Sequence, residues 1–199
     1  MRSVLEGQLA AALGSEARRE AEAALKLAPD SRDAEVQAAL TYAWSGDEGG
    51  ARKVESDLKK QFPLDPLVND YWPPTIDART ELAKSNPAGA LDRLQGVSSP
   101  LELGIACLYP VYTRAEADLA AGQGSAAAGE FQKIRDHVGV VQNCATGALG
   151  RLGLARAYAL AGNSAKARAA YQDFFTLWKD ADPDIPILKQ AKAEYAKLR

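Results

Sequence analysis

Residues 154–163 read LARAYALAGN, and they are followed by alanine at position 167 and tyrosine at position 171. Alanine favours a helix because it loses no side-chain entropy, and glycine ends helices because it adopts the left-handed backbone conformation without strain. The stretch therefore predicts a helix that ends at a turn around Gly162 and a second helix that begins just after it. Ala155 is expected where the two helices cross, since a larger side chain would separate their backbones.

The same pattern occurs earlier in the chain. Residues 38–47 read AALTYAWSGD and lead to Ala51, nine residues after Tyr42, and the same spacing separates Tyr158 from Ala167. A repeated hairpin of two helices is therefore predicted, in which tyrosine fills the gap between neighbouring hairpins.

Further copies and an internal alignment extend the repeat. Weaker copies begin at Ala78 and Ala115, and residues 16–29 align with residues 50–63 at a shift of 34 positions. The small residue early in each second helix is expected at Ala17, Ala51, Ala90, Ala127 and Ala167. Helix crossings are expected at Ala39, Ala78, Ala115 and Ala155, and turns with left-handed glycines at Gly46, Gly122 and Gly162.

Because 39 of the 199 residues are alanine and strand signals are thin, the expected fold class is all-α. The short run Val138–Val141 is interpreted as a loop or a helix end.

The repeat resembles the tetratricopeptide family, whose units are helical hairpins with a period of about 34 residues. The resemblance implies an α-solenoid of about five hairpins that forms a single superhelical domain over residues 1–199. A first hairpin, partial or complete, is expected near residues 2–28, and further hairpins near residues 32–61, 67–96, 101–137 and 146–180. A final helix over residues 185–198 is expected to cap the solenoid, with its lysines outward and Asp182 or Asp184 as its N-cap.

A more specific resemblance rests on three stretches. The tail over residues 170–198, FPLDP at 62–66 and LYPVY at 108–112 are similar to the C-terminal repeat region of bacterial, acidobacterial-type serine/threonine protein kinases. The chain contains no G-x-G-x-x-G loop, His-Arg-Asp loop or Asp-Phe-Gly motif. The resemblance therefore implies a non-catalytic fragment of a larger kinase.

The tetratricopeptide pattern also implies a concave face, lined by first-helix residues that point away from the second helices. The positions that it assigns to this face are Val36, Leu40, Trp44, Trp72, Thr75, Arg79, Tyr109, Tyr112, Glu116, Leu149, Leu152 and Arg156. Aromatic residues and arginine are common anchors of protein interfaces. The alternative is that Trp72, Tyr109 and Tyr112 only fill space where prolines distort the stack. Repeat domains that clamp chaperone C-termini present Lys and Asn at such positions, which this chain does not.

Composition argues against several classes of function. The 24 basic and 26 acidic residues give a formal net charge of −2, and the basic residues are scattered among acids, unlike the concentrated basic face of a nucleic-acid binder. One histidine and two cysteines are too few for a structural zinc site built from local motifs. No apolar run approaches the roughly 18 residues of a membrane-spanning helix. No metal, cofactor, nucleic acid or direct membrane insertion is therefore expected.

Individual reactive residues have structural interpretations. His137 is expected at the end of a helix, where its imidazole complements the helix dipole. Cys107 and Cys144 lie 37 residues apart, about one repeat, so free thiols are expected because stacked helices are about 10 Å apart. A disulfide would instead fit an extracytoplasmic location. The carboxylates of residues 180–184 lack the pattern of a calcium loop.

These observations predict a non-catalytic module that binds a peptide or protein segment on its concave face. The expected partner is a protein segment, the kinase domain of the same protein, or a second copy. The alternatives are a structural spacer or oligomerisation region and, as the reading with least support, an enzyme with a site in the groove. A soluble chain without its own targeting signal is expected, cytoplasmic or extracytoplasmic according to the anchoring of the parent kinase.

Overall fold

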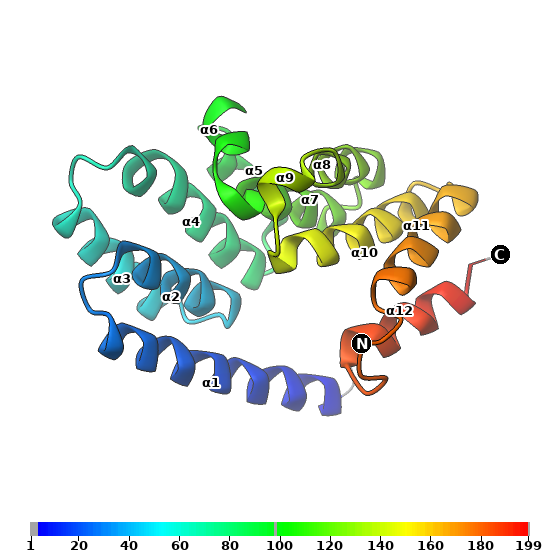
Figure 1. The fold of residues 1–199 in the computed structure, drawn as a ribbon, viewed down its shortest axis with the longest axis horizontal. Helices are drawn as coiled ribbons and strands as arrows, with labels where there is room; N and C mark the ends of the chain where they lie inside the picture. The colour runs from blue at the N-terminus through cyan, green and yellow to red at the C-terminus, as the bar shows by residue number, and fades with distance from the viewer. Residues whose placement is uncertain (1–3, 98, 199) are drawn as a thin grey trace. The chain divides into compact units, whose positions relative to one another are not determined.

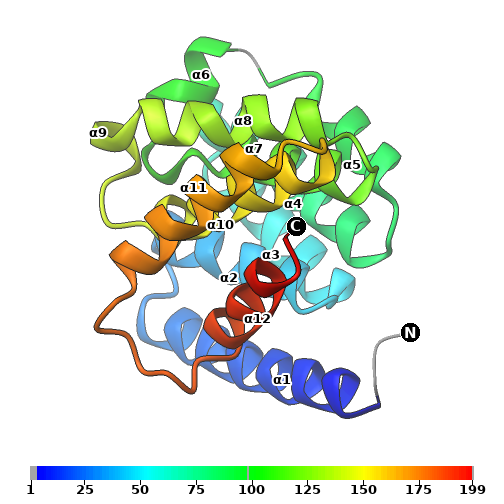
Figure 2. The same ribbon diagram turned by 90° about the vertical axis from the view of Figure 1, so that its right-hand side faces the viewer.

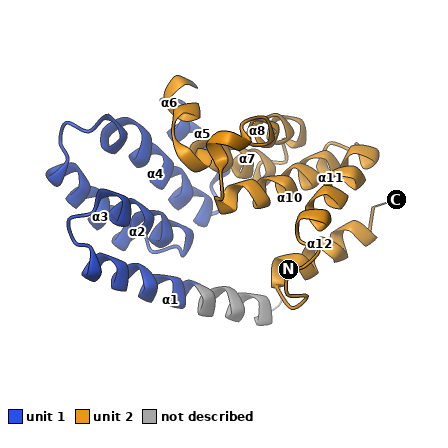
Figure 3. Cartoon of the chain, in the orientation of Figure 1, with its two compact units in different colours: residues 1–97 blue, residues 98–199 orange. Residues whose placement is uncertain are grey.

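The computed structural model describes the backbone of residues 4–97 and 99–198 and the side chains of residues 14–97 and 100–198. Within this part of the chain every regular element is a helix (Figure 1), which confirms the all-α prediction. The chain divides into two compact units, Met1–Val97 and Ser98–Arg199 (Figure 3). One continuous superhelix over residues 1–199 stays a prediction.

Unit 1 contains a long helix and two helical hairpins. Its elements are α1 (Val4–Leu27), α2 (Arg32–Trp44), α3 (Glu48–Gln61), the π-helical turn η1 (Leu67–Tyr71), α4 (Trp72–Ala83) and α5 (Pro87–Leu94). The pairs α2–α3 and α4–α5 pack together, and α2 also packs against α1 and α4. These bounds agree with the hairpins predicted over residues 32–61 and 67–96.

A complete hairpin over residues 2–28 is not formed, because α1 is one continuous helix. Gly14, near the middle of this helix, is helical. A Cβ atom on Gly14 would stand 3.5 Å from the Cβ atom of Ser45, at the end of α2. This is an ordinary van der Waals distance, so Gly14 lies where α1 packs on the end of α2, but the packing does not require a glycine.

Unit 2 contains two hairpins and a final helix. Its elements are α6 (Ser99–Gly104), the 3₁₀ turn η2 (Ala106–Leu108), α7 (Tyr109–Ala120), α8 (Gly124–Asp136), α9 (Val138–Val141), α10 (Ala145–Leu160), α11 (Ser164–Leu177) and α12 (Pro186–Ala196). Helix α7 pairs with α8 and α10 with α11, and α10 also packs against α8 (Figures 1 and 2). The hairpins predicted over residues 101–137 and 146–180 and the last helix agree with these bounds, and Val138–Val141 forms a short helical turn.

All four hairpin turns share one backbone geometry. An N–H group donates to the carbonyl five residues earlier, with N···O distances of 2.8 to 2.9 Å; the pairs are Asp47–Tyr42, Asn86–Glu81, Gln123–Asp118 and Asn163–Tyr158. The residue before each donor has a positive φ: 76° at Gly46, 60° at Ser85, 77° at Gly122 and 76° at Gly162. This is the Schellman arrangement, which satisfies the last carbonyls of the first helix. The three predicted glycine turns are confirmed, and Ser85 takes the same conformation without a glycine.

The residue that closes the first helix also starts the second in three of these turns. The side-chain oxygens of Asp47, Asn86 and Asn163 accept hydrogen bonds from the backbone N–H three residues later, at 2.9, 3.1 and 3.2 Å. Such N-caps satisfy donors that have no partner within the helix. Turn and cap together fix where each second helix begins.

The alanines predicted at the helix crossings are buried. Ala39, Ala78, Ala115 and Ala155 are fully buried, and so are the second-helix residues Ala51, Ala90, Ala127 and Ala167. Ala17, which lies in α1, is only half-buried. In unit 2, one hydrophobic cluster surrounds Phe131 between α7, α8 and α10, and another surrounds Phe174 between α10, α11 and α12.

The last helix packs as predicted, but its N-cap differs. Leu188 and Ala191 are buried, whereas the three lysines at positions 189, 192 and 197 are exposed. The prediction of Asp182 or Asp184 as N-cap is wrong, because the cap position is Ile185 and no side chain caps the helix. Pro186 follows it and has no N–H to satisfy. Asp182 instead accepts a hydrogen bond from the backbone N–H of Asp184 at 2.8 Å.

Candidate binding site

Trp44 and Arg79, two residues of the predicted concave face, come together in unit 1. The guanidinium carbon of Arg79, in α4, lies 4.8 Å from the centroid of the Trp44 ring at the end of α2. This is within the range of a cation–π interaction. Trp44 is 40% exposed and Arg79 is 9% exposed. The pair joins the first helices of two successive hairpins and leaves part of the indole accessible.

Trp72 and Thr75, which were assigned to the same face, belong to the interior. The rings of Trp72 and Tyr71 pack edge to face with centroids 4.6 Å apart. The Thr75 hydroxyl donates to the carbonyl of Tyr71 at 2.7 Å. Trp72 is thus a packing residue at the start of α4, as the alternative interpretation had it.

The assignment is wrong for Val36, Leu40 and Leu152, because these side chains are at most 1% exposed. Helix α2 is covered by α1, α3 and α4, so little of its surface remains for a ligand. Leu152 belongs to the cluster between α10, α11 and α12. All three residues stabilise the core.

In unit 2, α7 carries Tyr109, Tyr112 and Glu116. The Tyr112 hydroxyl donates to Oε1 of Glu116 at 3.1 Å, and its ring packs edge to face on Phe131 with centroids 6.0 Å apart. Tyr109 and Glu116 are half-buried, and so is Leu149 of α10, which packs against the Phe131 cluster. Tyr112 is therefore largely a core residue that orients Glu116.

Arg156 is held by the last helix. Its Nε and Nη2 atoms donate to the two carboxylate oxygens of Glu194, at 2.9 and 3.0 Å, and Tyr171 donates to Oε2 of Glu194 at 2.9 Å. Burial, followed by the hydrogen bond to Glu194, raises the pKa of Tyr171 well above its usual value, so the phenol stays a donor. Arg156 thus connects α10 to α12, a structural role.

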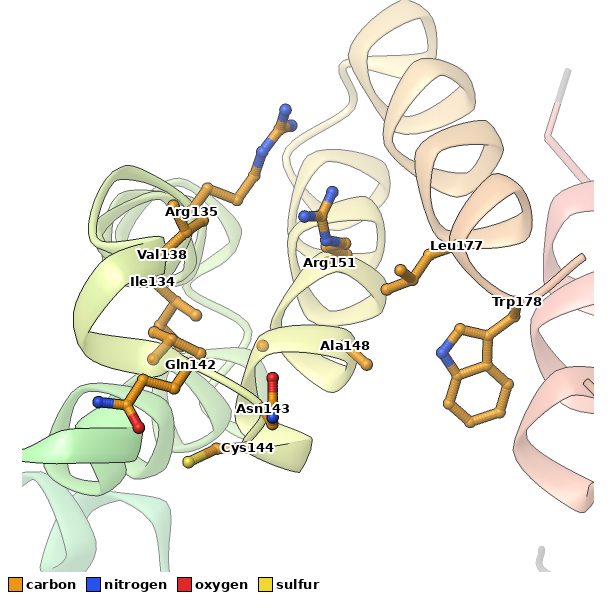
Figure 4. A pocket seen from close by; sticks show the side chains of 12 residues that line it. Ile134, Arg135, Val138, Gln142, Asn143, Cys144, Ala148, Arg151, Leu177 and Trp178 are labelled. Carbon is orange, nitrogen blue, oxygen red and sulfur yellow. The ribbon is translucent and has the colours of Figure 1, made fainter.

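A groove that the sequence did not predict lies in unit 2, at the ends of α8, α10 and α11. We call it the α8–α11 groove; its cavity volume is about 460 Å³. Figure 4 shows Ile134, Arg135 and Val138 on one wall and Leu177 and Trp178 on the other, with Ala148 and Arg151 of α10 between them. Its other lining residues are Val141, Gln142, Asn143, Cys144 and Gly147.

The sequence carried a weak signal for this groove. Val138, Leu177 and Trp178 are large apolar residues at helix ends, outside the positions that face a hairpin crossing. Val138 is 60% and Leu177 is 52% exposed. The signal was the presence of large apolar residues that fill no position of the repeat. Only the fold shows that these residues lie together.

A disulfide joins Cys107 and Cys144, so the prediction of free thiols is wrong. Stacked helices lie about 10 Å apart, whereas the Cα atoms of these two cysteines are 5.3 Å apart. Cys107 and Leu108 both have positive φ angles, 73° and 49°, which turn the chain sharply before α7. The hydroxyl of Thr146 also donates to the Cys107 carbonyl at 2.7 Å. The turn before α7 is therefore fastened to the start of α10.

Among the described residues, the ionisable groups show no metal-binding arrangement. There, no group of three or more His, Cys, Asp or Glu side chains is placed to hold a metal ion. His137 ends α8 as predicted, with Nδ1 2.7 Å from the Lys133 carbonyl. Burial raises the pKa of Glu35, although a hydrogen bond from Gln61 opposes the shift. Burial, followed by the charge of Glu130, raises the pKa of Asp118.

Comparisons with protein-family models, curated proteins and solved structures found no match for this chain. Among the helices in the described part of the chain, none combines the length and apolar character that crossing a membrane requires.

Proposed function

We propose that the chain is a tetratricopeptide-like repeat protein without catalytic function of its own, which binds a peptide or protein segment. The four hairpin turns with one geometry support a common repeat unit, and so does the buried alanine nine residues after each carbonyl that accepts the turn hydrogen bond. Repeat units of this kind bury their apolar faces against neighbouring units and leave extended surfaces for binding.

The observation that carries the binding proposal is the pair Trp44 and Arg79. Interfaces draw most of their energy from a few aromatic and arginine residues. The cation–π contact at 4.8 Å holds the indole in place while the residue as a whole remains 40% exposed. A partner that covers this ring would gain apolar contact without first ordering the side chain.

The larger context is part of the same proposal. The similarity of residues 170–198 to kinase-associated repeats supports a regulatory or scaffolding region of a serine/threonine protein kinase, with its own kinase domain as one candidate partner. The disulfide between Cys107 and Cys144 supports an oxidising, extracytoplasmic location, since disulfides rarely persist in the cytosol.

A structural spacer or self-association region is the second candidate. Burial of Val36, Leu40 and Leu152, and the engagement of Arg156 by Glu194, favour it, because these residues serve the chain's own packing. In that case unit 1 would offer no separate partner site around Trp44.

The test is a pull-down with the parent kinase domain and with lysate of the source organism, followed by calorimetry with each purified partner. Trp44→Ala should weaken binding by about 2 kcal/mol or more. Leu64→Ala is the matched control, since Leu64 is an exposed apolar residue outside the predicted face. Equal effects of the two variants would contradict the proposal. Self-association without any partner, measured by sedimentation, would establish the spacer instead.

A further inference from the structure

The α8–α11 groove of unit 2 has exposed apolar walls on two helices. Val138 on one wall and Leu177 on the other are more than half exposed, and the Trp178 ring lies beside Leu177 (Figure 4). The Trp178 ring packs against the Phe174 ring, with ring centroids 4.9 Å apart. Exposed apolar surface that lines a concavity marks binding sites more often than scattered apolar residues do.

The groove is also positively charged. Two arginines, Arg135 and Arg151, line it, and none of the described residues that line it is acidic. Arg135 forms an ion pair with Asp173 at 3.3 Å, but both side chains are more than a third exposed, so this pair is weak. Within the described part of the chain, the guanidinium group of Arg151 has no hydrogen bond or ion pair. The groove therefore has a guanidinium available to an anionic group.

The floor of the groove is fixed before any ligand binds. Cys144 is tied to Cys107 by the disulfide, and a Cβ atom on Gly147 would stand 2.8 Å from Cγ1 of Val141, so α9 lies tightly against α10. A site that is already ordered loses less conformational entropy on binding. Gln142 and Asn143 at the rim carry amide groups that both donate and accept hydrogen bonds, as a peptide backbone requires.

We propose that this groove binds a peptide segment of a partner protein in which an Asp or Glu stands close to a bulky apolar residue. The carboxylate would meet Arg151, and the apolar side chain would lie between Val138 and Leu177. A small molecule fits less well, because small-molecule sites bury most of their ligand whereas these walls are open. The groove belongs to unit 2 and the Trp44–Arg79 pair to unit 1, so variants of one do not test the other.

The experiment uses the full chain and three panels of short fluorescein-labelled peptides, measured by fluorescence anisotropy. One panel places Asp or Glu at every spacing from one to four residues from Leu, Phe or Trp. The second replaces the acids by Asn or Gln, and the third replaces the apolar residues by Ser. Peptides of the first panel should bind. The matching peptides of the other two panels should bind with an affinity at least about tenfold lower.

Two variants with matched controls localise the binding. Arg151→Glu should weaken it at least about tenfold, whereas Lys192→Glu, which makes the same charge change on the exposed face of α12, should not. Leu177→Ser should weaken it and Leu160→Ser, at a comparably exposed leucine, should not. Thermal unfolding followed by circular dichroism checks that each variant is folded.

Several outcomes would overturn the proposal. Acidic–apolar peptides that bind no better than the other panels would do so, as would equal losses in Arg151→Glu and Lys192→Glu. Saturation of the groove by dodecanoate with no peptide binding would make it a small-molecule site. A dimer in sedimentation equilibrium that Arg151→Glu dissociates would assign the groove to a second copy of this chain.

Discussion

The ring of Phe131 in α8 lies directly against the backbone of Gly153 in α10: a Cβ atom on Gly153 would stand 2.3 Å from Cζ of Phe131. Phe131 is fully buried and sits in the centre of the cluster between α7, α8 and α10. Gly150, one turn earlier, faces Ile134 in the same way, with a Cβ position 3.1 Å from its Cγ2. The glycines of α10 therefore set how closely its hairpin approaches the preceding one.

This contact predicts that Gly153→Ala destabilises the protein although alanine favours helices. The added methyl group must displace a buried ring, and overpacking of this kind costs about 1 to 3 kcal/mol. Gly129→Ala in α8 is the control, because nothing lies within 4 Å of its Cβ position. That variant should gain up to about 1 kcal/mol from helix propensity. Urea denaturation measures both, and a gain at both sites would mean that α8 and α10 are not this close.

The ion pair between Arg156 and Glu194 predicts that α12 depends on it for docking. Glu194→Gln removes the charge that faces Arg156 and should lower the free energy of unfolding by about 1 to 2 kcal/mol, since charged hydrogen bonds are stronger than neutral ones. Amide hydrogen exchange in α12 should accelerate more than in α7.

Lys189→Ala supplies the control on the same helix. Lys189 pairs with Asp184 at 2.8 Å, but both side chains are largely exposed, so the loss should be close to zero. If Lys189→Ala and Glu194→Gln loosen α12 equally, the two-point contact with Arg156 is not what anchors the helix.

The disulfide predicts that the purified chain contains no free thiol in a thiol-titration assay and that reduction weakens unit 2. A bond between residues separated by 37 positions should stabilise the fold by about 2 to 4 kcal/mol through the unfolded state. Dithiothreitol should therefore lower the melting temperature of the wild type and leave that of the Cys107→Ser, Cys144→Ser double variant unchanged. Two reactive thiols in the native, unreduced chain would contradict the bond.

The sequence predicted the hairpins because their chemistry is local. A glycine at positions 46, 122 and 162 can adopt the positive φ that ends the first helix, and the following Asp or Asn at positions 47 and 163 caps the second. Alanine at the predicted crossings indicates a close approach of two helix backbones, because a larger side chain would separate them. Each of these features depends on one residue type at one position, so spacing alone was sufficient.

What the sequence did not predict depends on several segments at once. Cysteine and leucine seldom adopt positive φ angles, so the residue types at positions 107 and 108 do not predict the turn that brings Cys107 to Cys144. The assignment of Val36 and Leu40 to an open face required knowing that α1, as one long helix, covers α2. The α8–α11 groove combines the ends of three helices, none of which has an unusual sequence by itself.

Asp118 gives the last prediction, which concerns pH. This carboxyl group is 6% exposed in α7; burial and the charge of Glu130 raise its pKa, while Arg114 and Lys133 oppose the shift. Because its pKa is higher in the folded chain than in the unfolded one, the folded state holds more protons between those two values. The contribution of Asp118 to stability is then full below the unfolded pKa and is lost as pH rises through the folded pKa.

Asp118→Asn, which keeps the shape without the charge, should raise the free energy of unfolding at neutral pH by about 1 kcal/mol, the scale of an incompletely paired buried group. Urea denaturation across the acidic range should show the advantage of the variant shrinking as pH falls, since both side chains are then neutral. A variant that is less stable at neutral pH would mean that Arg114 and Lys133 outweigh burial and that the Asp118 carboxylate stabilises α7.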